Sequence, residues 1–170
     1  QRLAVALRSN RAIHTLHLDR NNASDDFGRE MGITLTMNKT LHTLDLSDND
    51  IKFSGAAHLA QAMARNDTIT SLNLSRNSIG NEGATEVAKM LAENRTLRQL
   101  RMSWNTISDA GAHELAAVLR TNPALELFDV ADNRVSSVGA TELARALLVN
   151  TSIQSLFLSG NGIAGPGAQE

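Results

Sequence analysis

The sequence of 170 residues has no cysteine, few aromatic side chains and no long apolar run. The lack of cysteine argues against a disulfide-stapled secreted scaffold and fits a reducing compartment. The longest apolar stretches, such as residues 3–7 and 146–149, are far shorter than the ~20 residues that a membrane-spanning helix needs. No signal or transit sequence is visible at the start, so we expect a cytoplasmic protein.

Neither sign of charge dominates, because 16 Lys and Arg residues stand against 18 Asp and Glu residues. This balance gives no general attraction to nucleic acid or to an anionic membrane. Aromatic residues, at 3%, are too few for a base-stacking platform. No Ser/His/Asp set, phosphate-binding glycine loop or pair of carboxylates in a cleft can be assembled. We therefore predict no enzyme activity, no cofactor, and neither nucleic acid nor membrane as a partner.

The sequence does contain one pattern that returns every 28 residues. Each copy begins with an aliphatic residue, and an asparagine follows eight residues later. A period of this length is typical of a solenoid, whose units stack because none can bury its apolar face alone. We expect one array over residues 1–170, with a half-repeat at 1–11, repeats starting near residues 13, 41, 69, 97, 125 and 153, and the last repeat truncated.

One copy of the pattern predicts a strand followed by a helix. Residues 41–46 alternate apolar and polar side chains, which is typical of a short strand with one buried face. Leu59, Ala60 and Met63 then follow at helical spacing. Parallel strands stack about 4.8 Å apart, whereas helices are about 10 Å wide. We therefore predict an α/β solenoid in the form of a horseshoe, with parallel strands on the concave face and helices on the convex face.

Small and polar residues recur at positions that fit this packing. A glycine followed by alanine begins each helix, and we expect the recurring asparagine to bridge the loops of adjacent repeats. The first complete repeat departs from the pattern, because Ala23 replaces the usual isoleucine and Phe27 replaces the glycine. We expect Phe27 to fill the volume that Ala23 leaves empty. The helix-start glycines are Gly55, Gly83, Gly111, Gly139 and Gly167.

The full pattern, L-x-x-L-x-L-x-x-N-x-I-x-x-x-G-A-x-x-L-A-x-x-L-x-x-N-x-T over residues 12–168, resembles the leucine-rich repeats of the ribonuclease-inhibitor type. Its uniform repeat length is similar to that of nucleotide-binding immune receptors, Ran GTPase-activating protein and capping-protein regulators. The resemblance implies protein binding by the concave face and the adjoining loops. We therefore interpret the chain as a non-catalytic protein-binding scaffold.

Trp104 is the most suggestive residue of the predicted concave face, because its position is charged in four of the other five repeats. Tryptophan and arginine are enriched among residues that dominate binding energy. Three interpretations stay open for the indole: contact with a partner, stacking over Arg101 or Arg76, and burial against a flanking segment. The predicted partner site is Arg76, Arg101, Trp104, Leu127, Asp129, Asp132 and Phe157, with His17, Asp45 and Asn73 as a secondary concave-face set.

Two charge patterns on this face have plain structural interpretations. His17 and Asp45 are cross-strand neighbours with Asp19, His14 and His42 close by, so a cation site is imaginable. We expect a simple hydrogen bond between His17 and Asp45 instead, and predict no metal site. The charged residues that follow the strands are interpreted as a self-neutralising ladder of weak ion pairs. The alternative is that they set partner specificity by charge matching. They are Arg20, Asp48, Arg76 and Asp132.

Neither end of the sequence carries a recognisable cap, so we expect Leu156 and Leu158 to leave one side of the core uncovered. This favours a fragment of a longer array, with end-to-end self-association through the uncapped repeats as the alternative. The family resemblance also allows two other functions. They are activation of a small GTPase and ligand sensing in an innate immune receptor or effector.

Overall fold

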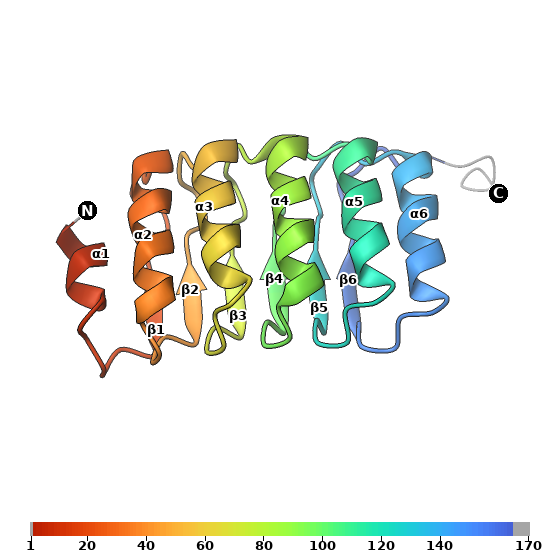
Figure 1. The fold of residues 1–170 in the computed structure, drawn as a ribbon. Helices are drawn as coiled ribbons and strands as arrows, with labels where there is room; N and C mark the ends of the chain where they lie inside the picture. The colour runs from red at the N-terminus through yellow and green to blue at the C-terminus, as the bar shows by residue number, and fades with distance from the viewer. Residues whose placement is uncertain (1, 165–170) are drawn as a thin grey trace.

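The computed structural model describes residues 2–164 as one parallel sheet with a row of helices on one side (Figure 1). The strands are β1 (Thr15–His17), β2 (Thr43–Asp45), β3 (Ser71–Asn73), β4 (Gln99–Arg101), β5 (Leu127–Asp129) and β6 (Ser155–Phe157). The helices are α1 (Arg2–Leu7), α2 (Asp25–Met37), α3 (Phe53–Met63), α4 (Gly80–Glu93), α5 (Asp109–Leu119) and α6 (Ser137–Leu147). The predicted helix start at Gly167 lies outside the described residues.

The register of the sheet follows the sequence repeat without slipping. The strands lie in chain order, and each residue pairs with the one 28 positions further on, as Leu16 does with Leu44 and Leu100 with Phe128. Because helices need more width than strands, the strand layer is the inner, concave one. The predicted α/β solenoid is confirmed. Within the described residues, no helix has both the length and the apolar character needed to cross a membrane.

The core fills the space between the strand layer and the helix layer. The central strand residues Leu44, Leu72, Leu100 and Phe128 are at most 2% exposed. Leucines and methionines of the helices close the other side, and together these residues form one continuous cluster. Leu156 and Leu158 are only partly buried, as we expected. Each repeat therefore completes its core with side chains of its neighbours.

The asparagine after each strand joins adjacent repeats, as predicted. Asn77 Nδ2 donates to the carbonyl oxygens of Leu46 and Leu74, both at 3.0 Å, and its Oδ1 accepts from the backbone N of Ile51 at 2.9 Å. Asn77 is buried. Its Nδ2 also lies 3.2 Å from Ser75 O. A buried amide that bonds to four backbone groups stabilises a loop that has lost its sheet partners.

A second asparagine ladder lies where the helices end, and the sequence analysis gave it no role. Asn94 Nδ2 donates to Met63 O at 2.7 Å, and its Oδ1 accepts from the backbone N of Thr96 and of Leu97. The same contacts recur in each repeat, so this ladder joins the opposite edge of the solenoid. Its other members are Asn38, Asn66, Asn122 and Asn150.

Helices α2 and α3 approach each other closely because α2 carries glycine in place of the usual alanines. A Cβ atom added to Gly28 would lie 2.8 Å from Gly55 Cα, and one added to Gly32 would lie 2.7 Å from His58 O. Phe27 packs against the core, in line with its expected role. Ala23 and Phe27 also line an open depression of about 380 Å³ at the surface.

The helix starts are capped from the preceding repeat. Asp25 Oδ1 accepts from the backbone N of Lys52 and of Gly55, at 2.7 and 2.9 Å. Phe53 occupies the equivalent position in the next repeat and has no acceptor. The start of α4, which a residue at position 53 would cap, therefore differs from the other helix starts. Gly80 has a φ of +67° and its N donates to Asn105 O. Helix α4 begins one residue earlier than the repeat pattern gives. The missing acceptor explains this local irregularity.

Candidate functional site

The candidate site is built from two rows of side chains on the concave face and along its edge. The third residues of the strands form the strand column, which is His17, Asp45, Asn73, Arg101, Asp129 and Phe157. Three residues further on, the turns contribute the turn column, which is Arg20, Asp48, Arg76, Trp104, Asp132 and Gly160. Within a column, residues of adjacent strands are neighbours because the strands pair in register.

Every residue of the turn column has a left-handed backbone, which the sequence analysis missed. The φ angles run from +52° at Asp132 to +58° at Arg20, and Gly160 has +69°. This region favours glycine and tolerates aspartate, whereas a bulky side chain there is unusual. Gly160 was the signal that could have revealed the geometry. Trp104, at +57°, therefore has a side chain that the backbone does not favour.

Trp104 stacks against one neighbour and keeps its other surface open. The guanidinium carbon of Arg76 lies 4.8 Å from the centroid of the indole ring. Arg76, and not Arg101, is thus the stacking partner of Trp104. The tryptophan is still 49% exposed, so the stack leaves a large aromatic surface for another molecule.

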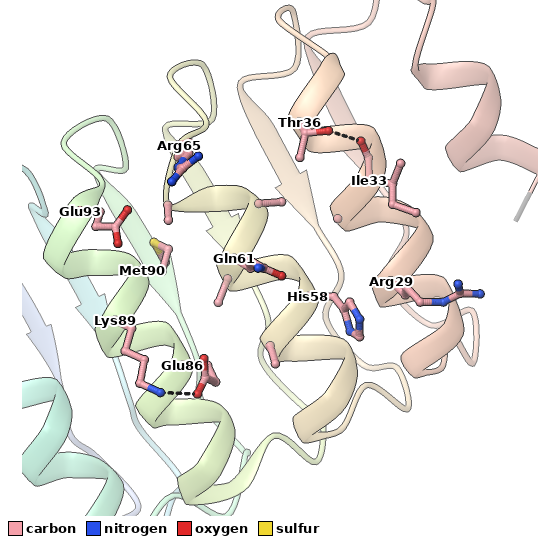
Figure 2. Close-up of a pocket in the computed structure, with 15 residues that line it drawn as sticks. Arg29, Ile33, Thr36, His58, Gln61, Arg65, Glu86, Lys89, Met90 and Glu93 are labelled. Carbon is pink, nitrogen blue, oxygen red and sulfur yellow. Dashed lines mark hydrogen bonds and ion pairs between the residues drawn. The ribbon is translucent and has the colours of Figure 1, made fainter.

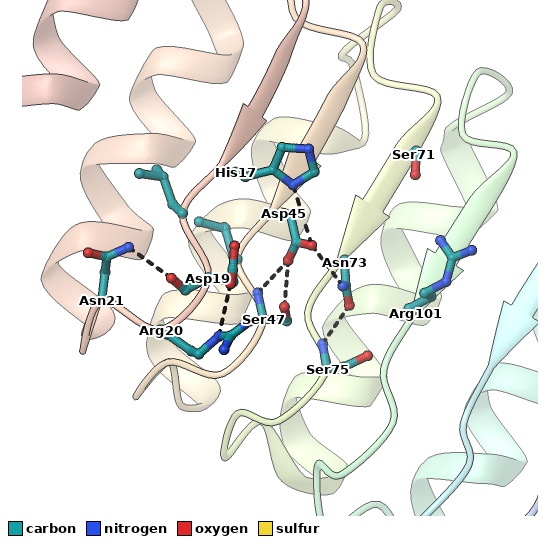
Figure 3. Close-up of polar contacts among 12 residues, drawn as sticks. His17, Asp19, Arg20, Asn21, Asp45, Ser47, Ser71, Asn73, Ser75 and Arg101 are labelled. Atoms are coloured by element: carbon teal, nitrogen blue, oxygen red, sulfur yellow. Dashed lines mark hydrogen bonds and ion pairs between the residues drawn. The ribbon is translucent and has the colours of Figure 1, made fainter.

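Three members of the strand column brace the turns that follow them. Asp45 accepts from the backbone N of Ser47 at 2.8 Å, Asn73 from that of Ser75 at 3.1 Å, and Asp129 from that of Ala131 at 3.0 Å. Such bonds to the residue two positions on are typical of turns stabilised by Asp or Asn. Figure 3 shows the first two of these contacts. These side chains are thus partly committed to the fold.

Asp45 is the most strongly held carboxylate of the concave face. Burial alone would raise its pKa, but hydrogen bonds from Ser47 Oγ at 2.6 Å, from the Ser47 backbone and from Asn73 Nδ2 outweigh that effect. The pKa of Asp45 is therefore lowered from the ordinary value. Its carboxylate is ionised at neutral pH.

Arg101, Leu127 and Phe157 lie together on strands β4 to β6. Arg101 pairs in register with Asp129, which in turn pairs with Phe157. Arg101 Nη1 donates to Gln99 Oε1 at 3.3 Å, and among residues 2–164 it forms no ion pair. Leu127 is half-buried and Phe157 is 48% exposed. This end of the concave face therefore offers a cation beside apolar surface.

The predicted ladder of ion pairs along the turn column is wrong for the part of the chain that the structure describes. Arg20 Nε bonds to Asp19 Oδ2 at 3.1 Å and not to Asp48, and Arg76 lies over Trp104. The guanidinium of Arg20 thus pairs with the residue before it, and that of Arg76 stacks on an aromatic ring, instead of pairing with an aspartate of the next turn. Asp48 and Asp132 form no ion pair within residues 2–164.

A hollow of about 900 Å³ crosses α2, α3 and α4 on the convex face, and the sequence analysis did not predict it (Figure 2). It exists because α3 presents small residues, among them Ala57 and Ala60, between two helices with longer side chains. Lys89 Nζ and Glu86 Oε1 pair at 2.7 Å on its rim. None of the residues predicted as binding residues lies there.

The comparison with known proteins identifies the repeat. The family model for the leucine-rich repeat matches residues 38–60, 65–88, 93–116 and 149–170, which together are more than half of the chain. No curated protein matches the sequence.

Solved structures share the fold at low sequence identity. One is actin-binding site 2 of leiomodin-1, with 19% identity, a TM-score of 0.70 and coverage of 85% of this chain and 87% of that one. Another is the tropomodulin C-terminal domain of Caenorhabditis elegans, with 13% identity, a TM-score of 0.72 and coverage of 85% and 89%. With the repeat model matched and the fold shared, this chain belongs to the leucine-rich repeat family.

Proposed function

We propose that this chain is a non-catalytic scaffold, a single array over residues 1–170, that binds another protein through its concave face and turn column. Trp104 carries the proposal. Its indole is half exposed, one face is fixed by Arg76, and its backbone conformation would suit glycine better. The fold does not need an indole here, since Gly160 holds the same position two repeats later. A rigid exposed aromatic beside arginines has the composition of an interface hot spot.

The remaining residues of the site are expected to contribute unequally to the binding energy. Arg101 and Phe157 are expected to contribute binding energy, because one is a cation without an ion pair in residues 2–164 and the other is a half-exposed aromatic. Asp129 braces its own turn and is expected to contribute less. Leu127, Arg76 and Asp132 surround them. His17, Asp45 and Asn73 form the secondary set near the first repeats.

The chemistry of this surface favours a partner segment that carries an apolar side chain next to a carboxylate. The apolar side chain would pack on Trp104 or Phe157, and the carboxylate would pair with Arg101. One of the similar structures is an actin-binding site of leiomodin-1, which supports a protein as the kind of partner. Nothing within residues 2–164 favours GTPase activation or ligand sensing.

Capture of a partner tests the proposal. The chain is used as bait in an extract of its native source, bound proteins are identified by mass spectrometry, and the affinity of the purified partner is then measured. The triple variant Arg101→Glu, Trp104→Gly, Phe157→Ala should lose binding while it keeps the circular dichroism spectrum. Equal affinity of the triple variant and the original chain would refute the site.

Self-association is a further part of this proposal, and it rests on the uncovered side of the last repeat. Leu156 and Leu158 are only partly buried there, and Leu147 is 38% exposed whereas its counterpart Leu119 is 2% exposed. We expect the sedimentation coefficient of the chain to rise with concentration, and the substitution Leu147→Glu to abolish that rise. A coefficient that stays constant over the accessible concentrations would remove this part.

A further inference from the structure

Three metal-ligating side chains converge at the first two repeats, away from Trp104. His17 lies on β1, Asp19 follows in the next turn, and Asp45 lies on β2. One ligand atom from each lies within 4.8 Å of the other two, and Figure 3 shows His17 directed at Asp45. No other repeat has histidine as the third strand residue together with aspartate two residues later, as His17 and Asp19 are.

The hydrogen bond that the sequence analysis expected between His17 and Asp45 is not formed. His17 Nδ1 lies 3.8 Å from Asp45 Oδ2, which is too long for a hydrogen bond. Within residues 2–164, the imidazole of His17 makes no hydrogen bond at all. The expectation was therefore wrong. The line between the two side chains in Figure 3 marks an ion-pair contact, and neither ring nitrogen is held by a hydrogen bond within residues 2–164.

The two carboxylates are held in place by groups around them. Asp45 Oδ1 accepts from Ser47 N at 2.8 Å and from Ser47 Oγ at 2.6 Å, while its Oδ2 faces His17 and accepts from Asn73 Nδ2 at 3.1 Å. Asp19 uses Oδ2 for Arg20 Nε, so its other oxygen has lone pairs to offer. Hydrogen-bonded ligand carboxylates are typical of metal sites, where the outer groups orient the ligands.

The sequence alone predicted no metal at these residues. With the three ligand atoms brought this close together, we propose that His17, Asp19 and Asp45 bind a divalent transition-metal ion of the zinc class. One imidazole nitrogen and two carboxylate oxygens suit such an ion, whereas Ca²⁺ and Mg²⁺ prefer oxygen ligands alone. Bonds of about 2.0–2.2 Å to the metal require the ligand atoms to draw closer together. His17 can make that movement, because its side chain is 62% exposed. Three protein ligands leave a fourth position for water or for a donor atom of another molecule.

His14 and His42, which the sequence placed close to His17, lie outside the cluster and provide the control. The rings of His14 and His42 lie 5.3 Å apart at the other end of the strands. Nδ1 of each lies within hydrogen-bonding distance of Thr40 O, at 2.8 and 2.6 Å. Their Nδ1 atoms are thus engaged, and neither histidine belongs to the group of ligand atoms formed by His17, Asp19 and Asp45.

Calorimetric titration of the chain with Zn²⁺ at neutral pH tests the proposal. We expect one ion to bind per chain, and His17→Ala and Asp45→Asn each to weaken binding at least about tenfold. His42→Ala should leave it unchanged. Circular dichroism confirms that each variant is folded, which the surface position of His17 favours.

Three outcomes would overturn the metal site. They are the absence of Zn²⁺ binding, equal binding by the original chain and His17→Ala, and loss of binding in His42→Ala alone. Ca²⁺ should bind more weakly than Zn²⁺, and equal affinity for both ions would exclude the imidazole as a ligand.

Discussion

The guanidinium of Arg76 lies 4.8 Å from the centre of the Trp104 ring, and both residues have left-handed backbone conformations in consecutive turns. The stack therefore joins two repeats at the edge of the concave face. At an exposed site a cation–π contact contributes about 0.5–1 kcal/mol. Its larger effect is to fix the orientation of an indole that is half open to solvent.

Trp104→Gly should separate binding from stability. Glycine relieves the left-handed strain of about 1–2 kcal/mol, while the loss of the stack removes about 0.5–1 kcal/mol. We therefore expect the free energy of unfolding, measured in urea, to change by less than about 1 kcal/mol, and the affinity for the partner to fall. A large loss of stability would show that the indole belongs to the fold and not to an interface.

Asn77→Ala should destabilise the chain far more than Asn21→Ala. Removing the buried Asn77 amide leaves Ile51 N without its acceptor, and a buried unsatisfied group costs about 1–3 kcal/mol. Leu46 O and Leu74 O each lose one donor but keep Asn49 and Asn105. Asn21 is exposed, and its amide donates only to Asp19 O. Urea unfolding should show a loss of at least about 1 kcal/mol for Asn77→Ala. Similar values for the two variants would contradict the ladder's structural role.

Gly32→Ala tests the close approach of α2 and α3 through the sign of its effect. Alanine in place of glycine inside a helix is ordinarily stabilising by about 1 kcal/mol. Here the new Cβ would lie 2.7 Å from His58 O, so the helices must move apart. We expect a net destabilisation of about 1–3 kcal/mol, measured as a lower midpoint of thermal unfolding. Ile33→Ala, at an exposed position of the same helix, is the control with a smaller effect, and stabilisation by Gly32→Ala would be evidence against the contact.

Asp45 should make stability depend on pH in the acid range. Its pKa is lower in the folded chain than in the unfolded chain, where about 3.9 is ordinary. Its contribution is therefore complete above the unfolded value and is lost as the pH falls through the folded one. Carboxyl chemical shifts in an NMR titration should report the lowered pKa, and Ser47→Ala should raise it by removing the hydroxyl donor. An unchanged pKa in Ser47→Ala would show that the hydroxyl bond is not its cause.

The fold could be predicted because the core positions hold apolar residues in every repeat. Leu44, Leu72 and Leu100 keep both the period and the chemistry of the buried strand position, so register and layer order followed directly. The irregular start of α4 could not be predicted in this way. It depends on Phe53, which lacks the acceptor that its counterpart Asp25 supplies from the preceding repeat.

The candidate site was only partly visible in the sequence. Trp104 stood out because its side chain breaks a charged pattern, and its stacking on Arg76 was among the alternatives. The left-handed turn was hidden, because Arg, Asp and Trp occupy positions where only Gly160 signals the geometry. Whether Asp129 binds a partner or braces a turn depends on a bond to Ala131, and that bond is a property of the folded backbone.

The most direct test of the concave binding surface compares two phenylalanines of equal exposure. Phe157 on the concave face and Phe53 on the convex face are both 48% exposed. Calorimetry with the captured partner should show that Phe157→Ala weakens binding at least about tenfold, as expected for a hot-spot residue, and that Phe53→Ala leaves the affinity unchanged. Weaker binding by Phe53→Ala together with unchanged binding by Phe157→Ala would place the partner on the helices and contradict the account.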